Sequence, residues 1–267
     1  MQNIDPVYFA TPVAVLTLMT ALVVYWRRRR TLAGQAMLYS LVAYAAAIAL
    51  KYAVQIPTIG AFQSLTGGNP VALGVYYGAQ TAAFEVGGAY IVARIAISRS
   101  RLRSDDAEGF GLGLAFWENA GLFAVPLLIN YVAYYAILSV PASSAAQLLY
   151  PVLARDAPAL FLPPSSALPV VGYAVLERVS SFFVHFAWGL LCVLSAASRR
   201  KAYLAAALPM GFLIDFLVPF SPSVGVGPFE LIVFLVSAAA LAVALTLTRS
   251  ARNMQAVNAS GPPASNT

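Results

Sequence analysis

Charged residues, cysteine and histidine are scarce in this chain of 267 residues. Asp, Glu, Lys and Arg make up 10% of it, whereas a soluble globular domain carries about 25%. This shortage excludes a water-soluble body, because too few polar side chains remain to cover its surface. The single cysteine, Cys192, excludes an internal disulfide and a cysteine-based metal site. The single histidine, His185, excludes any site that needs two.

Apolar residues make up 60% of the chain instead, and the mean hydropathy is +0.77. A bilayer core about 30 Å thick needs roughly 20 mostly apolar residues per helix. The apolar runs predict an all-α polytopic membrane protein with one transmembrane domain, residues 1–252, and a disordered cytoplasmic tail, residues 253–267. The fourth run is long enough to tilt or to break near Pro126. We expect seven spans, at Tyr8–Trp26, Gln35–Val54, Leu73–Ile97, Phe110–Leu138, Leu168–Ala196, Leu204–Phe220 and Phe229–Thr248.

Basic residues gather on one side of the expected spans. They follow the first, third, fifth and seventh runs, whereas the loops at 56–70, 141–167 and 221–228 contain a single basic residue, Arg155. By the positive-inside rule, the N-terminus lies outside and the C-terminus lies in the cytoplasm. The basic residues that give the net charge of +6 are therefore expected to orient the helices and to contact anionic lipid headgroups. Nucleic-acid binding is not expected. We expect a multi-pass protein of the cell membrane, surrounded by lipids.

Ionisable side chains within the spans are the candidates for chemistry. Each costs about 2.5–3.5 kcal/mol at mid-helix, so it is expected to face protein or trapped water. By the expected topology, Glu85, Glu118, His185 and Asp215 lie at a common depth, roughly a third to half of the way from the cytoplasmic face. One shared site is therefore geometrically allowed.

Two interpretations of these charges stay open. Carboxylates and an imidazole in a dry pocket can hold a divalent metal ion, or they can activate a water that attacks a carbonyl. The same charges can instead pair, for example Glu177 or Glu85 with Arg178, and lock the helices together. Small residues are expected to serve close helix packing rather than chemistry, namely Gly111, Gly113 and Gly121. Snorkelling is expected near span ends for Lys51, Arg94 and Glu230.

Four segments resemble, in order along the chain, the motifs of the YhfC/PrsW-like intramembrane proteases. Phe84–Tyr90 resembles the first motif, in which a Glu-Glu pair is followed three residues later by Arg and then Tyr. Gly111–Asn119 resembles a glycine-rich motif that ends in Glu-Asn. Glu177–His185 resembles a Glu-Arg helix with a His eight residues after the Glu, and Gly211–Asp215 resembles His-x-x-x-Asp.

The resemblance implies a membrane endopeptidase of the CAAX-protease-like group, which acts on a membrane peptide or protein. Position by position, Glu85 matches the water-activating glutamate and Glu118 matches the carboxylate of the second motif. His185 and Asp215 match later site residues. The positions expected to support them are Asn119, Glu177 and Arg178.

Three positions depart from the family pattern. Val86 stands in place of the second Glu, Ala89 in place of the Arg, and Gly211 in place of the last motif's His. These changes remove a bidentate partner and a ligand or oxyanion donor. The resemblance therefore leaves open a diverged glutamate-dependent peptidase, with or without metal, and a non-catalytic relative that binds membrane peptides. Two further classes stay open: a proton- or cation-coupled carrier or channel, and a structural subunit of a membrane complex.

Overall fold

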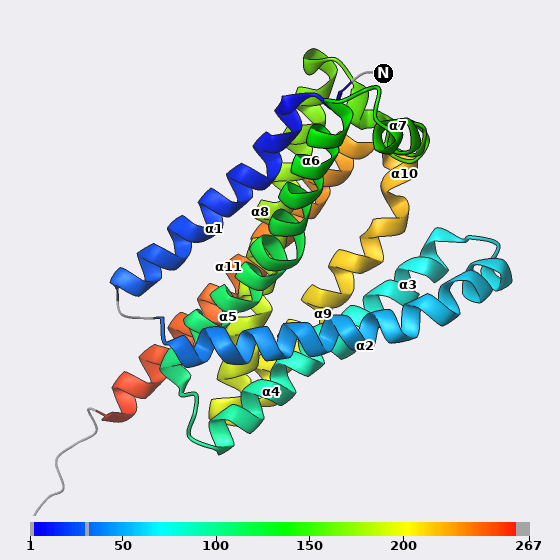
Figure 1. The fold of residues 1–267 in the computed structure, drawn as a ribbon. Helices are drawn as coiled ribbons and strands as arrows, with labels where there is room; N and C mark the ends of the chain where they lie inside the picture. Colours follow the sequence, from blue (N-terminus) through cyan, green and yellow to red (C-terminus); the bar gives the residue numbers. More distant parts are fainter. Residues whose placement is uncertain (1–2, 30–31, 260–267) are drawn as a thin grey trace, which may run out of the picture.

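The computed structural model describes residues 3–29 and 32–259, with residues 251–259 as backbone alone, and in this part the chain is helical and contains no strand. Seven of its helices are long and apolar enough to cross a bilayer (Figure 1). The expected all-α fold with seven spans is therefore confirmed. The structure gives the spans as Pro6–Arg28, Gly34–Thr66, Pro70–Ser98, Ser104–Leu138, Pro164–Ser198, Lys201–Val224 and Val226–Ser250.

The chain begins at one end of the bundle, and its last helix, α11 (Val226–Ala259), ends at the opposite end (Figure 1). This arrangement follows from an odd number of spans. Which end faces the cytoplasm stays a prediction from the loop charges. Of the expected disordered tail, residues 253–259 belong to α11, and residues 260–267 lie outside the described residues.

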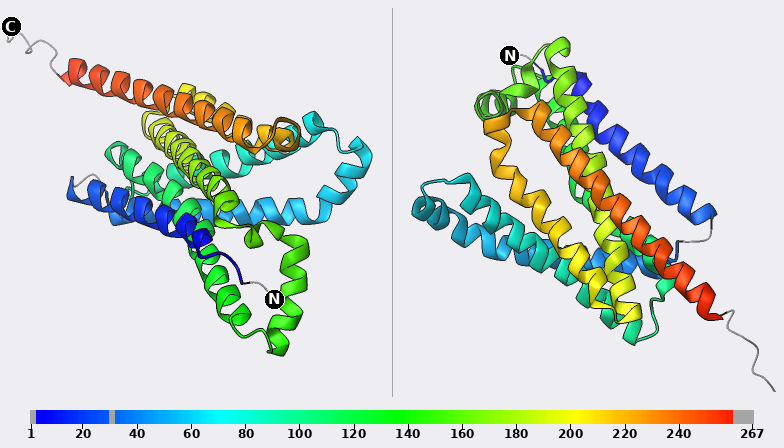
Figure 2. Two further views of the ribbon diagram at one scale, coloured as in Figure 1. Left: turned by 90° about the horizontal axis from the view of Figure 1, so that it is seen from above. Right: turned by 180° about the vertical axis from the view of Figure 1, so that it is seen from behind.

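The second span is longer than its apolar run indicates. α2 (Gly34–Thr66) continues past Val54 and through Pro57, and it ends at Gly67, whose φ of 60° is left-handed. Glycine adopts that conformation readily, which makes it a common helix terminator. Much of the loop expected at 56–70 is therefore helical. Figure 2 shows the resulting hairpin of α2 and α3 (Pro70–Gln80) projecting from the rest of the bundle.

The loop expected at 141–167 also contains a helix, α7 (Ser144–Asp156). Its N-terminus is capped by Ser143, whose Oγ accepts a hydrogen bond of 3.1 Å from the Ala146 N–H. Together with the N-terminal turn η1 (Pro6–Phe9), this segment forms a small apolar core at one end of the bundle. The expected loop is thus a packed cap.

Two spans contain a π-helical turn. The third span consists of α3, the π-helical η2 (Thr81–Val86) and α4 (Gly87–Ser98). The fourth consists of α5 (Ala107–Phe116), the π-helical η4 (Trp117–Ala124) and α6 (Val125–Leu138). The fourth span therefore passes Pro126 as one helix, and this proline follows directly after the π-helical turn, where the regular pattern of backbone hydrogen bonds is already interrupted.

α8 (Pro164–Ser198) lies at the centre of the bundle and packs against α4, α5, α11 and α9 (Lys201–Leu217). Its crossing with α5 depends on two glycines. A Cβ on Gly111 would lie 2.6 Å from the Phe186 carbonyl oxygen, and a Cβ on Gly189 would lie 2.7 Å from the Gly111 Cα. Small residues thus allow backbone contact between these helices.

The packing role expected for three glycines holds for two of them. Gly111 lies at the α5–α8 crossing, and a Cβ on Gly113 would lie 2.0 Å from Ser40 Oγ on α2. Gly121 differs, because the nearest atom to its Cβ position belongs to Trp117 of the same span, at 3.3 Å. Its small size therefore serves no helix crossing among the described residues.

Candidate functional site

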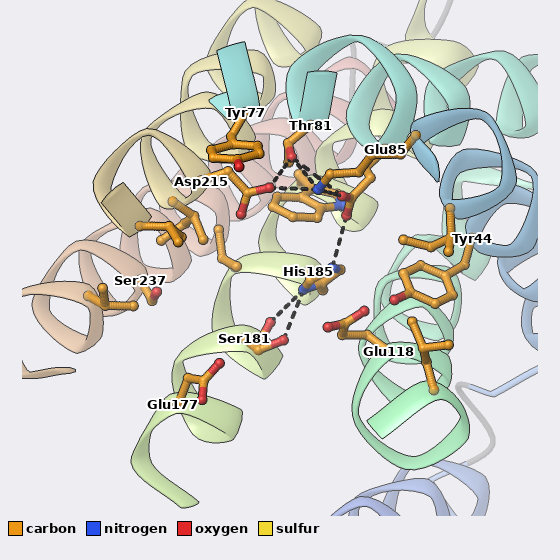
Figure 3. A pocket seen from close by; sticks show the side chains of 18 of the residues that line it. Tyr44, Tyr77, Thr81, Glu85, Glu118, Glu177, Ser181, His185, Asp215 and Ser237 are labelled. Atoms are coloured by element: carbon orange, nitrogen blue, oxygen red, sulfur yellow. Dashed lines mark hydrogen bonds and ion pairs between the residues drawn. The ribbon is translucent and has the colours of Figure 1, made fainter. Parts of the chain in front are cut away.

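A cavity of about 430 Å³ lies among the membrane helices, and six of the seven residues expected at the site line it. Figure 3 shows Glu85, Glu118, Glu177, His185 and Asp215 around it. Its wall is built from α2, α3, η2, η4, α8, α9 and α11. The helices thus bring together side chains that are up to 130 positions apart in the sequence. The six are Glu85, Glu118, Glu177, Arg178, His185 and Asp215.

Lys51 links two of the expected carboxylates. Its Nζ lies 2.6 Å from Glu85 Oε1 and 2.6 Å from Asp215 Oδ2, and it donates a third hydrogen bond of 2.8 Å to Thr81 Oγ1. The side chain is 13% exposed. These contacts use all three donors of the ammonium group.

The expectation that Lys51 snorkels at a span end is therefore wrong. It assumed that the second span ends near Val54, whereas α2 continues to Thr66. Lys51 consequently lies in the middle of the helix and deep in the bundle, where its side chain turns into the cavity. A lysine at such a depth needs anionic partners, and Glu85 and Asp215 supply them.

Thr81 completes this cluster. Its hydroxyl donates to Asp215 Oδ2 and lies 3.4 Å from Glu85 Oε1. The residue is 1% exposed, and it begins the π-helical turn η2 that also carries Glu85. Sequence reasoning missed both Thr81 and Lys51, since neither belongs to a motif that the chain resembles.

Glu85 uses its other carboxylate oxygen toward the histidine. Oε2 lies 3.4 Å from His185 Nε2. The other ring nitrogen, Nδ1, lies 2.9 Å from the Ser181 carbonyl oxygen, which can only accept, so Nδ1 carries a hydrogen. Trp188 covers the ring at a centroid distance of 4.2 Å. The ring is thereby held with Nε2 toward Glu85.

Four buried polar atoms on residues of the cavity wall have no hydrogen-bond partner in the part of the chain that the structure describes. They are the Tyr44 hydroxyl, Arg178 Nε, His185 Nε2 and Ser237 Oγ. A buried polar group without a partner costs about 1–3 kcal/mol. The cavity is therefore suited to water or to a polar ligand that supplies the missing partners.

Arg178 organises the other end of the cavity. Its Nη1 lies 3.3 Å from Glu118 Oε1, its Nη2 donates to Glu177 Oε1, and its guanidinium lies 4.3 Å from the centre of the Phe123 ring. Of the two pairs suggested for Arg178, the structure contains the one with Glu177, whereas Glu85 pairs with Lys51. Figure 3 shows His185 between the two ends.

Asn119 is the one expected site residue that does not line the cavity. It is fully buried, and its Nδ2 donates a hydrogen bond of 2.8 Å to the Ala115 carbonyl oxygen one turn earlier. The structure therefore places it behind the wall that carries Glu118.

Both glutamates that match the family's motifs lie on the π-helical turns, Glu85 on η2 and Glu118 on η4. A π-helical turn inserts one extra residue, which rotates the following side chains, and such turns are frequent at functional sites. The turns therefore mark the same two segments as the motif resemblance, on independent grounds.

Two of the three departures from the family pattern contact each other. A Cβ on Gly211 would lie 2.5 Å from Val86 Cγ2, and Val86 and Ala89 are both fully buried. A larger side chain at position 211 would have to displace Val86. An apolar contact thus stands next to Glu85 where the family pattern has polar side chains.

The model of one protein family, described as YhfC intramembrane metalloprotease, matches residues 13–236. This range includes every cavity-lining residue that carries charge, from Lys51 to Asp215. Searches of curated proteins and of solved structures returned no match.

The description of that family implies a metal ion, and the cavity does not fit one as it is arranged. Among residues 3–29 and 32–250, no three His, Cys, Asp or Glu side chains are grouped as metal ligands. Zinc is held by its ligands at about 2.0–2.3 Å, from three or more of them. Between Glu85 and Asp215, that position is filled by the Lys51 ammonium, and Cys192 is buried in the core on α8.

Proposed function

The chain belongs to the YhfC intramembrane metalloprotease family, and on this premise we propose that it is an endopeptidase that hydrolyses peptide bonds in membrane-embedded segments, with Glu85 as the general base. The observation that carries the proposal is the position of Glu85. Its carboxylate lies in the wall of an intramembrane cavity, held on one side by Lys51 and faced on the other by His185. We further propose that it acts in the cell membrane with its N-terminus outside.

The two oxygens of Glu85 have different roles in this proposal. Oε1 is fixed by Lys51, which leaves Oε2 to accept a proton from a water that His185 Nε2 helps to orient. The water oxygen forms a bond to the peptide carbonyl carbon, while its proton moves to Oε2. The C–N bond then breaks, and the departing amine takes that proton. The products are one peptide that ends in a carboxylate and one that begins with an amine.

Polar groups elsewhere on the wall support a peptide as the ligand. The Tyr44 hydroxyl and Ser237 Oγ face the cavity without hydrogen-bond partners among the described residues. A peptide backbone supplies donors and acceptors together, whereas an acyl chain supplies neither. Arg178 and Glu118 add a charged surface at the far end, where part of a substrate can be held.

A cleavage assay in proteoliposomes tests the role of Glu85. The purified chain is reconstituted with a mixture of fluorescently labelled single-span peptides, and products are identified by mass spectrometry. Glu85→Gln keeps the shape of the side chain but cannot take the proton, so cleavage should fall by about 10²–10⁴-fold. Asp156→Asn is the matched control, because this acid lies at the end of α7, outside the spans, and is 54% exposed. Cleavage at the original rate in the Glu85→Gln variant would refute the proposal.

A proton-coupled carrier is the second candidate, and the row of titratable side chains along the cavity favours it. Asp215, Glu85, His185 and Glu118 line one continuous cavity, and such rows conduct protons in pumps and transporters. In proteoliposomes with a pH-sensitive dye inside, this function requires a proton flux that His185→Gln abolishes. Cleavage without flux would favour the peptidase instead.

A further inference from the structure

We infer that the Lys51 ammonium supplies the positive charge that a metal ion would otherwise give to Glu85 and Asp215, so that this chain works without a divalent metal. The inference goes beyond family membership, whose description names a metalloprotease. Its catalytic meaning rests on the proposed function, but its main measurement, metal binding, does not require cleavage.

The geometry around Lys51 Nζ is the first ground. Carboxylate oxygens from two different spans lie 2.6 Å from it, Glu85 Oε1 from η2 and Asp215 Oδ2 from α9. Thr81 Oγ1 is the third acceptor at 2.8 Å. Three oxygens thus converge on one cation, as they would on a metal, but at the distances of charge-assisted hydrogen bonds.

Electrostatics is the second ground. The side chains of Lys51, Glu85 and Asp215 are only 13%, 7% and 24% exposed, so the two carboxylates cannot rely on water to separate their charges. Two like charges that share a buried site are unfavourable unless a cation lies between them or one takes up a proton. Lys51 is that cation, and it leaves no room for a second one between the same oxygens.

The surrounding fold is the third ground. Lys51 lies halfway along α2 (Gly34–Thr66), and its side chain meets η2 and α9 inside the bundle. Thr81 on the π-helical turn accepts a hydrogen bond from the ammonium group. Val86, the residue after Glu85 on η2, packs against Gly211 of α9 and offers no further metal ligand beside Glu85. The lysine is therefore built into this site from three spans.

The test measures metal binding by the purified full chain in detergent. The protein is treated with chelator, dialysed against Zn²⁺ or Co²⁺, freed of excess metal, and assayed by inductively coupled plasma mass spectrometry. Wild type should retain no more metal than the Glu85→Gln variant. About one tightly held ion per chain in wild type, lost in Glu85→Gln, would overturn the inference.

The Lys51→Ala variant should bind metal, in contrast to the wild type. Without the ammonium group, the three oxygens that converge on it, from Glu85, Asp215 and Thr81, have no cation between them, and the variant should gain about one Co²⁺ per chain with its visible absorption. The double variant Lys51→Ala with Glu85→Gln should lose that gain. No gain of Co²⁺ in a folded Lys51→Ala protein would contradict the claim that Lys51 fills a position suited to metal. If Lys51→Ala fails to fold, Lys51→Met is measured in its place. If neither variant folds, the metal content of the wild-type protein decides the test.

Cleavage assays with and without chelator distinguish this inference from the proposed function. Wild type that cleaves in the presence of chelator at an unchanged rate supports both. Cleavage that the chelator abolishes and Zn²⁺ restores would overturn the role of Lys51 while keeping the peptidase. A metal-free protein that cleaves nothing would refute the peptidase while keeping Lys51 as the cation of the site.

Discussion

The two ends of the cavity are each built from one cation and two carboxylates, but the groups are connected differently. At one end, Lys51 pairs with Glu85 and Asp215, so that α2, η2 and α9 are joined. At the other end, Arg178 pairs with Glu118 from η4 and with Glu177, its neighbour in the sequence. The first cluster holds three spans together, whereas the second joins only two.

Exposure separates Glu177 from the other three carboxylates. At the Lys51 end the two carboxylates are 7% and 24% exposed, and at the Arg178 end they are 19% and 44% exposed. A buried charge that loses its partner stays uncompensated, whereas a half-exposed one can be hydrated. The comparison therefore teaches that the Lys51 cluster is integral to the fold, whereas the Arg178 cluster can adapt at Glu177.

Removal of Lys51 should have the largest effect on stability. Lys51→Met leaves Glu85 and Asp215 buried without their cation, and we expect a loss of about 3–5 kcal/mol in the free energy of unfolding. Arg178→Met leaves Glu118 and Glu177, which are 19% and 44% exposed, without their cation, and we expect a smaller loss of about 1–3 kcal/mol because water can reach Glu177. Unfolding by SDS in mixed micelles, followed by far-UV circular dichroism, measures both.

A charge-compensated variant distinguishes electrostatics from packing. Lys51→Met with Asp215→Asn removes one cation and one anion together, so it should be more stable than Lys51→Met alone. Equal stability of the single and double variants would show that Lys51 acts through its packing and not through its charge.

The fold was predictable from the sequence because composition and span length are strong constraints in a membrane. Seven apolar runs gave seven helices, and Gly111 and Gly113 lie at helix crossings as small residues are expected to. The ends of the runs were less predictable. Hydropathy does not report that α2 continues through Pro57 to Thr66, because a helix can extend beyond the bilayer core with polar residues on its surface.

The end of α2 limits how much of the site the sequence predicts. Glu85, His185 and Asp215 were expected at one depth, and the structure places them on one cavity. An interfacial Lys51 follows only from a span that ends near Val54, and α2 ends at Thr66. The π-helical turns at Glu85 and Glu118 leave no sequence pattern that periodicity can detect, since one inserted residue looks like ordinary helix.

Substitutions of the carboxylates at the Arg178 end should lower stability less than removal of Lys51, and the effects at Glu118 and Glu177 should differ. Glu118→Gln keeps an oxygen that accepts from Arg178 Nη1 but removes the charge, so we expect a loss of about 1 kcal/mol in stability. If this end holds substrate, the apparent KM should rise while kcat stays close to that of wild type. A fall in kcat as large as that of Glu85→Gln would instead place Glu118 in the chemical step.

Glu177→Gln should have the smallest effect, within about 0.5 kcal/mol of wild type. Its carboxylate is 44% exposed and bonds a residue adjacent in sequence, so the pair orders no long-range contact. The same SDS titration compares it with Glu118→Gln, whose partner lies on another helix. A loss for Glu177→Gln as large as for Lys51→Met would break the distinction between the two ends, because the adjacent pair would then carry as much stability as the cluster that joins three spans.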